Sequence, residues 1–257
     1  MKNFTLLIST KNRPFLLERA LKYYSDWDCE IIVCDGSDLP FQFDFKNIIY
    51  IHLPNLPVVK KILHGINQVK TEYFCLAADD DFFIKSSFIN GINFLQNNED
   101  FVGVQGQFAN FQIKDNEIYF CNSYLENNNR IISNNDFSKR IIYAFNNLTI
   151  HAYSLFRTNA AKKAIEVSSK LNSSVHCEIC LIIFPLLYGK HLSTFDLWAI
   201  RDTARYTDHS KSDSKNYDES PYIDFSQYIL TQEFFEYKKL FIQEVNNLNN
   251  TKTNSSF

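Results

Sequence analysis

The sequence predicts an α/β fold in which a mostly parallel, doubly wound sheet is flanked by helices. Three observations support this class. Short apolar runs typical of buried strands alternate with segments of helical periodicity. The runs end in polar turn residues such as Asp35-Gly36-Ser37. Finally, 45% of the 257 residues are hydrophobic, which is enough to bury a substantial core.

The first half of the sequence shows this alternation most clearly. Pro14 is typical of the first position of a helix, and Gly36 closes the second strand. The expected elements are strand 4–10, helix 14–24, strands 30–34 and 48–53, helix 58–69 and strand 73–77. Because parallel strands end at one edge of a sheet, we expect Thr10, Asp35 and Asp79 to share a crevice.

The second half is less regular. The expected elements are strands at 102–108 and 117–120 and helices at 159–171, 178–188 and 234–245. Residues 202–224 are polar and predict a mobile loop. The apolar stripe of the last helix is expected to dock on the core, with a membrane-surface or partner-binding face as the alternative.

Composition and charge exclude several classes of protein. A formal net charge of −3 gives no general attraction to nucleic acid. The six cysteines do not form a disulfide pattern, and Cys177 and Cys180 lack a second pair to complete a zinc site. The first apolar run lacks a cleavage site, and the longest is too short to span a bilayer. We therefore expect a cytoplasmic protein that binds no nucleic acid.

The most informative segment is the acidic triplet, Asp79-Asp80-Asp81, which directly follows an apolar run. Adjacent carboxylates repel one another, so a fold that keeps them together needs a cation nearby. Hard oxygen ligands favour Mg²⁺, Mn²⁺ or Ca²⁺. The triplet therefore predicts a divalent metal site at a strand end, with a solvated acidic turn as the alternative.

Three segments occur in an order that points to a known family. They are Leu6 to Pro14, which ends in Thr-Lys-Asn-Arg-Pro, then Glu30 to Ser37, which ends in Asp-Gly-Ser, and the acidic triplet with its preceding strand. Together they cover about the first third of the chain. The set resembles the GT-A glycosyltransferases, specifically the family-2-like enzymes of bacterial polysaccharide synthesis, in which the third motif is Asp-x-Asp.

The resemblance implies a nucleotide-binding set at the ends of the first strands: Thr10, Asn12, Arg13, Asp35, Asp79 and Asp80. A carboxylate at position 35 can accept the N3–H of uracil, and a turn-capping role is the alternative. Asp81, with Asp79, would ligate Mn²⁺ or Mg²⁺, which would bind both phosphates of the leaving nucleoside diphosphate. One sequence does not fix the register of the three aspartates.

The resemblance also implies a general base in the second half. Glu178, counted back from Gly189, falls on the family's base position, although Ile179 stands where a second acid is usual. Asp196 and His176 are the alternatives. A glutamate in a first helical turn is also explained by the helix dipole alone.

Further basic residues match later elements of the family. Arg205 is expected to bind phosphate, and His209 to ligate the metal. Lys60 and Lys61 could reach the nucleotide, but a solvated helix face is the favoured interpretation. A match of low specificity to an acceptor-side segment of the related bacterial transferases is formed by Asn147, His151, Tyr153 and Arg157.

The family implies a metal-dependent, inverting transferase that moves a sugar from a nucleotide donor, with UDP favoured, to a saccharide hydroxyl. It implies one domain over 1–200, with a nucleotide-binding half (1–100) and an acceptor-binding half (101–200), and then a loop and helical extension over 201–257. A role in capsule or lipopolysaccharide synthesis, with possible peripheral association at the inner face of the cell membrane, follows by analogy.

Three other functions were weighed against this one. A sugar nucleotidyltransferase usually has a glycine-rich loop after the first strand, and residues 9–14 contain no glycine. A phosphohydrolase usually carries aspartates on the first strand, which has none here. A catalytically silent nucleotide- or sugar-binding protein is the alternative from a different class, and turnover of a donor separates it from an enzyme.

Overall fold

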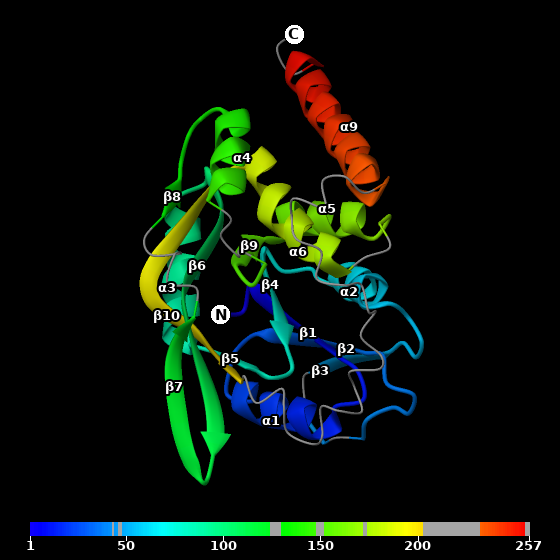
Figure 1. The fold of residues 1–257 in the computed structure, drawn as a ribbon, viewed down its shortest axis with the longest axis vertical. Helices are drawn as coiled ribbons and strands as arrows, with labels where there is room; N and C mark the ends of the chain where they lie inside the picture. Colours follow the sequence, from blue (N-terminus) through cyan, green and yellow to red (C-terminus); the bar gives the residue numbers. More distant parts are fainter. Residues whose placement is uncertain are drawn as a thin grey trace.

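The central feature of the molecule is one large mixed sheet. The computed structural model describes residues 1–42, 44–45, 48–123, 130–147, 152–171, 174–202 and 232–254. Within them, 10 strands form a sheet in the order β3-β2-β1-β4-β9-β6-β10-β5, with β7 paired to β6 and β8 to β10 (Figure 1). From the pairings, β1, β2, β3, β4, β6 and β10 run in one direction and the others oppose them. The predicted α/β class with a mostly parallel sheet is confirmed.

The strands of the parallel half lie close to their predicted bounds, whereas several in the other half were not predicted. The strands are β1 (Phe4–Thr10), β2 (Glu30–Asp35), β3 (Ile48–His52), β4 (Tyr73–Ala78), β5 (Asp81–Phe83), β6 (Phe101–Lys114), β7 (Glu117–Ser123), β8 (Ile131–Ile132), β9 (Leu155–Arg157) and β10 (Lys190–Asp202). The helices are α1 (Pro14–Tyr24), α2 (Val58–Ile66), α3 (Lys85–Asn97), α4 (Phe137–Asn146), α5 (Thr158–Ser168), α6 (Ser174–Ile183), α7 (Pro185–Tyr188) and α9 (Gln232–Asn254).

Helices cover the sheet on both faces, so the core is divided into two layers. Successive side chains of a strand point to opposite faces. In β1, Leu6 and Ile8 pack in the layer under α1 and α3, and Leu7 packs in the layer under α2, α5 and α6. Burial on both faces explains why the early strands are continuous apolar runs rather than alternating ones.

The helix expected at 178–188 is instead two helices. α6 begins at Ser174, ends at Ile183 and is followed by α7, which starts at Pro185. Proline has no N–H to donate and so separates the two. Glu178 therefore lies in the middle of α6 rather than in a first turn, and the helix-dipole explanation of this residue is wrong.

The C-terminal helix α9 packs against the layer that contains α5 and α6, as expected for its apolar stripe. Tyr237 is buried there and makes an edge contact with Phe184 at 6.0 Å between ring centroids. Glu244 accepts a hydrogen bond from the Tyr188 hydroxyl and pairs with Lys163 at 3.1 Å. Among the described residues, no helix has the length and apolar character needed to cross a membrane.

Candidate functional site

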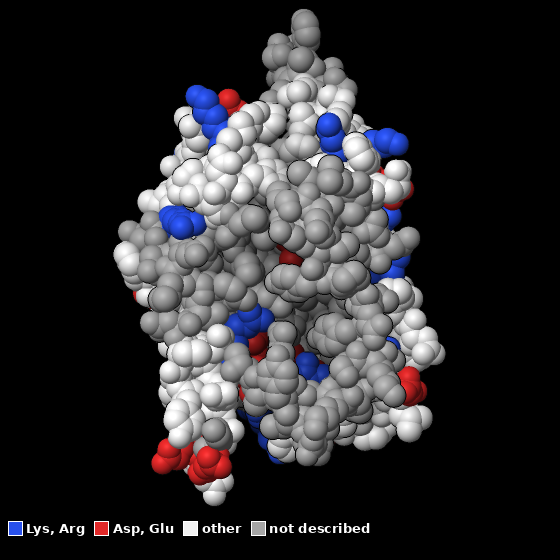
Figure 2. All heavy atoms as spheres, in the orientation of Figure 1, with Lys and Arg blue, Asp and Glu red and all other residues white. Residues whose placement is uncertain are grey.

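The parallel register brings the predicted strand-end residues together. Thr10 lies opposite Asp35 in the β1–β2 pair, and Ser9 lies opposite Ala78 in the β1–β4 pair. Asp79 therefore follows β4 at the edge where Thr10 ends β1. Figure 2 shows acidic and basic atoms side by side in a hollow at the centre of one face of the molecule.

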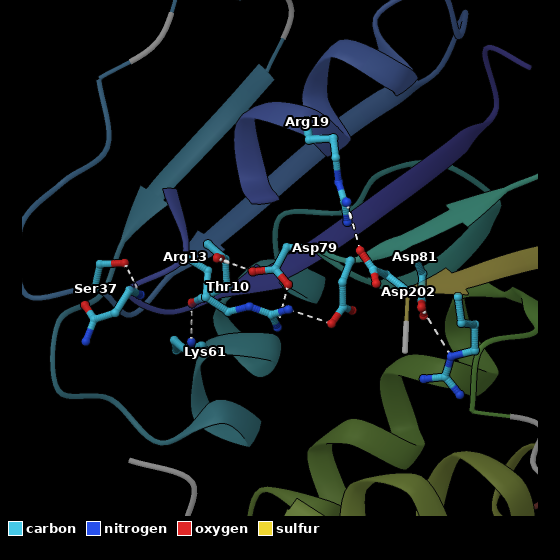
Figure 3. Close-up of polar contacts among 11 residues, drawn as sticks. Thr10, Arg13, Arg19, Ser37, Lys61, Asp79, Asp81 and Asp202 are labelled. Atoms are coloured by element: carbon cyan, nitrogen blue, oxygen red, sulfur yellow. Dashed lines mark hydrogen bonds and ion pairs between the residues drawn. The ribbon is translucent and has the colours of Figure 1, made fainter. Parts of the chain in front are cut away.

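Arg13 and Thr10 hold the first two carboxylates of the triplet (Figure 3). The Thr10 hydroxyl donates to Asp79 Oδ2 at 2.6 Å. The Arg13 guanidinium spans both acids, with Nη1 2.8 Å from Asp79 Oδ1 and Nη2 2.5 Å from Asp80 Oδ2. Asp79 is only 2% exposed, and burial raises its pKa to about 7 even though Arg13 and Thr10 act in the opposite direction.

The third carboxylate faces a different arginine. Asp81 begins β5, where antiparallel pairing places it opposite Arg201 of β10. The Arg201 Nε lies 3.2 Å from Asp81 Oδ1, and the two side chains are 12% and 1% exposed. The Arg201 guanidinium also lies over the rings of Tyr153, at 4.9 Å, and Phe108, at 5.9 Å. The triplet is thus divided between two cations from opposite halves of the sheet.

Asp35 lies in a pocket beside the triplet. Its Oδ1 accepts from the Ser37 amide at 2.8 Å and the Ser37 hydroxyl at 2.5 Å, and its Oδ2 accepts from the Tyr50 hydroxyl at 2.6 Å. A carboxylate has about four acceptor sites, so one more donor can be accepted. The pocket has a volume of about 550 Å³ and is lined by Thr10, Asn12, Pro14, Leu17, Asp35, Ser37, Asp38, Leu39, Pro40, Phe41 and Gln42.

Asn12 joins the turns that follow β1 and β2. Its amide donates to Ser37 Oγ at 2.7 Å, and its side-chain Oδ1 accepts from the Asp38 amide at 3.2 Å. The residue has a φ of 54°, in the left-handed region that asparagine tolerates better than most residues. This conformation explains why asparagine suits the position.

Lys61 corrects a prediction. Its side chain is only 2% exposed, and its Nζ donates to the Thr10 carbonyl at 2.7 Å. A Cβ on Gly36 would lie 2.7 Å from that Nζ, so the turn after β2 and the lysine are mutually fitted. Burial lowers the pKa of Lys61, while Asp35 and Asp79 raise it. The interpretation as part of a solvated helix face is right for Lys60, which is exposed, and wrong for Lys61, which is buried.

Glu178 is exposed on α6, and its charge acts on the Tyr153 phenol. Burial raises the pKa of the Tyr153 phenol, and the charges of Glu178, Asp81 and Asp80 raise it further while Arg201 opposes them. The charges of the predicted base and of the predicted metal ligands therefore act on the same tyrosine. Asp196, the alternative base, is exposed on β10.

Some predicted residues lie outside what the structure describes. These are Arg205 and His209, the rest of the predicted loop at 203–224, the acceptor-side His151, and the side chain of His176. Their predicted roles stay predictions.

The chemistry of the triplet fits a divalent metal whose coordination the substrate completes. Among the described side chains, no group of three or more His, Cys, Asp or Glu is placed to hold a metal ion. Mg²⁺ usually takes one or two carboxylates and completes its shell with water and substrate phosphates. Asp81, with Asp79 as a second candidate, supplies oxygen ligands of this kind, and Asp79 is hydrogen-bonded to Thr10 of the pocket lining.

Comparison with known proteins identifies the fold. No protein-family model matches the sequence, and no curated protein matches it. Among solved structures, S. aureus TarS superposes with a TM-score of 0.55 at 14% identity, over 80% of this chain and 37% of TarS. TarS 1–349 in complex with UDP superposes with a TM-score of 0.54 at 15% identity, over 79% of this chain and 61% of that one. TarS 1–349 in complex with UDP-GlcNAc superposes with a TM-score of 0.54 at 14% identity, over 82% of this chain and 61% of that one.

This chain has a GT-A-like glycosyltransferase fold. The predicted fold is therefore confirmed, whereas identities of 14–15% do not carry the narrower assignment to a family-2-like polysaccharide enzyme. The chain spans less than two thirds of the length of these TarS structures.

Proposed function

We propose that this chain is a metal-dependent glycosyltransferase that transfers a sugar from a UDP-linked donor to a saccharide hydroxyl with inversion. The observation that carries the proposal is the pocket of about 550 Å³ at Asp35 in a GT-A-like fold, whose lining residue Thr10 is hydrogen-bonded to Asp79 of the buried triplet. A volume of this size suits a small ligand. TarS, which shares the fold, was solved with UDP and with UDP-GlcNAc.

In this proposal the nucleoside occupies the Asp35 pocket. Ser37 and Tyr50 hold the Asp35 carboxylate in place, and its remaining acceptor capacity is available to the N3–H of uracil. Burial and the bond to Asp35 raise the pKa of Tyr50 to about 12, so its hydroxyl remains a donor at neutral pH. Thr10, Asn12 and the turns that they fix form the wall around the ribose.

Transfer then requires a hydroxyl nucleophile and a base on the face away from the leaving group. Glu178 is proposed to accept the proton of the acceptor hydroxyl, which gives a single in-line displacement and inverts the anomeric centre. A divalent metal held by Asp81 and Asp79 would stabilise the negative charge that develops on the departing diphosphate. Arg205 and His209 are proposed to complete the phosphate and metal contacts.

The acceptor is proposed to be a bacterial surface polysaccharide, such as capsule or lipopolysaccharide. The support is the resemblance of the first third of the sequence to enzymes of that group, not a feature of the acceptor side. Such a role would place the protein in the cytoplasm at the inner face of the cell membrane.

Calorimetric titration of UDP tests the proposal most directly. We expect micromolar binding with Mn²⁺ present and much weaker binding after chelation, and Asp81→Asn is expected to abolish the metal-dependent part. UDP-GlcNAc is the first donor to assay for hydrolysis and transfer, because TarS was solved in complex with it.

Three outcomes would change the proposal. Preference for GDP or CDP would keep the transferase and replace the nucleotide. Tight UDP binding without turnover of any donor would favour a catalytically silent binding protein. Absence of binding to any nucleoside diphosphate would reject the transferase.

A further inference from the structure

Arg201 is the side chain at the site that the proposed chemistry has not yet used. It comes from β10, on the far half of the sheet from the nucleotide pocket, and is placed opposite Asp81 by the β5–β10 register. Its guanidinium is 12% exposed and lies over the rings of Tyr153 and Phe108. Packing against these two rings thus holds a cation beside the carboxylate proposed to bind the metal.

The charges of the triplet are balanced mainly by the chain itself. When all three carboxylates are ionised they carry a charge of −3, and Arg13 and Arg201 supply +2 through the ion pairs at 2.5–3.2 Å. A divalent ion that binds the same oxygens must displace at least one guanidinium. In this buried setting, a displaced guanidinium without a new anionic partner costs free energy.

The diphosphate of the donor is the natural new partner. Guanidinium groups bind phosphate oxygens through strong, charge-assisted and often bidentate hydrogen bonds. A metal that arrives together with the diphosphate therefore replaces the ion pairs that it breaks, whereas a metal that arrives alone does not.

Resting on the proposed function, we propose that Arg201 is a further binding residue of the donor site that exchanges partners. In the ligand-free chain it neutralises Asp81 and competes with the metal. When the metal and the nucleoside diphosphate bind, it transfers to the diphosphate. Arg13 makes the corresponding exchange from Asp79 and Asp80. Each ligand then improves the affinity of the other, beyond their direct contact.

The exchange predicts two changes of opposite sign in Arg201→Met, which keeps an apolar side chain against Tyr153 and Phe108. Without nucleotide, Mn²⁺ affinity is expected to rise about tenfold, because the competing cation is gone. With Mn²⁺ saturating, UDP affinity is expected to fall about tenfold, because the diphosphate loses a partner. A residue that only maintained the shape of the site would weaken both when removed.

Arg19→Met is the matched control. Arg19 pairs with Asp202 at 2.8 Å and lies over the ring of Phe82 at 4.9 Å, so it is also a stacked, carboxylate-bound arginine near the site. It does not contact the triplet in any interaction seen here (Figure 3). We expect it to leave both affinities at the wild-type level.

The measurements are Mn²⁺ binding followed by electron paramagnetic resonance of the free ion and UDP binding by calorimetry, on wild type, Arg201→Met, Arg201→Lys, Arg13→Met and Arg19→Met. Arg201→Lys retains the charge and should restore Mn²⁺ affinity toward wild type. If Arg201→Met does not fold, Arg13→Met tests the same exchange at Asp79 and Asp80.

Unchanged or weaker Mn²⁺ binding in both Arg201→Met and Arg13→Met would overturn the partner exchange. So would an increase in Mn²⁺ affinity without any loss of UDP affinity. Either result, obtained with wild type that binds UDP in a metal-dependent manner, leaves the proposed function standing. Failure of wild type to bind any nucleoside diphosphate would instead reject the proposed function itself.

Discussion

The two halves of the sheet place their side chains in different ways. In the half formed by β1 to β4, the site residues directly follow strands that run in parallel, so their convergence needs only the parallel register. In the half formed by β6 to β10, Arg201 reaches Asp81 across an antiparallel pair, after a strand with irregular register. The nucleotide side is therefore built from local motifs, and the opposite side from long-range pairing.

This difference separates two kinds of function within one site. Asp35, Thr10 and Asn12 are fixed by turns of a few residues, which suits recognition of a constant nucleoside. Tyr153, Arg201 and Glu178 come from three distant segments. Under the proposed function, variation in those segments can change the acceptor without disturbing the pocket, so mutations on the two sides should have separable effects.

The largest expected effect comes from Glu178→Gln, which tests the acceptor side alone. Removal of a general base typically lowers turnover by roughly 10²–10⁴-fold. Because Glu178 is exposed on α6 and does not line the Asp35 pocket, we expect UDP affinity and thermal stability to remain unchanged. Steady-state kinetics of sugar transfer and calorimetry with UDP measure the two quantities.

Asp196→Asn is the matched control for that variant, because Asp196 is the other exposed acid considered as the base. We expect it to transfer sugar at nearly the wild-type rate. The reverse pattern, with Asp196→Asn inactive and Glu178→Gln active, would move the base to β10. A loss of UDP affinity in Glu178→Gln would contradict the separation of the two sides.

The first half of the fold could be predicted from the sequence because its signals are local. β1 and α1 have the predicted bounds, and β2 and β4 each differ by one residue at their ends. Each strand is an apolar run closed by polar residues, and Pro14 marks the start of α1. The meeting of Thr10, Asp35 and Asp79 followed from parallel topology alone.

The second half could not be predicted to the same degree, because long-range pairing decides it. The sequence does not predict β10, and Arg201 falls at the start of the loop and extension expected over 201–257, although the apolar run from 197 to 200 precedes it. The register of β10 against β6 shifts between Ser193 and Leu197 and again before Ala199. Since a one-residue slip turns a side chain to the opposite face, sequence pattern cannot state which residue meets Asp81.

The next largest effect is expected from Lys61→Met, which tests the nucleotide side. Lys61 is buried beside Asp35 and Asp79, so its loss leaves both carboxylates less neutralised and makes the site more repulsive to a diphosphate. At an effective dielectric constant of about 20, a unit charge roughly 6–11 Å from the diphosphate contributes about 1.5–3 kcal/mol, so UDP affinity should fall about 10–100-fold. Calorimetry at fixed Mn²⁺ concentration measures the change.

Lys60→Met controls for the removal of one positive charge from α2. Lys60 is exposed and donates to the Ser169 carbonyl rather than to the site. We expect UDP affinity in this variant to stay within about twofold of wild type, because exposed charges are screened. Equal losses in both variants would mean that Lys61 acts only through general charge, and no loss in Lys61→Met would exclude it from the nucleotide side.

The smallest expected effect is on stability and comes from Asp79→Asn, measured without metal or nucleotide. Burial raises the pKa of Asp79 from 3.8 to about 7, so the folded state binds this proton more tightly than the unfolded state. The wild type therefore loses stability as the pH rises from about 4 to about 7, and the variant lacks this loss. Between pH 6 and pH 7 alone we expect the variant to gain about 1 kcal/mol on wild type, a few degrees in Tm.

Asp202→Asn separates the pH effect from the loss of an ion pair, since Asp202 pairs with Arg19 as Asp79 pairs with Arg13. Thermal unfolding of the three proteins across pH 5–8 gives the comparison. A gain in stability in Asp79→Asn but not in Asp202→Asn would show that the ligand-free site keeps a carboxylate ionised at a cost in folding stability, as functional sites often do. Parallel curves for wild type and Asp79→Asn would mean that Arg13 and Thr10 fully compensate the burial of Asp79, and the nucleotide side would then be no less stable than the rest of the sheet.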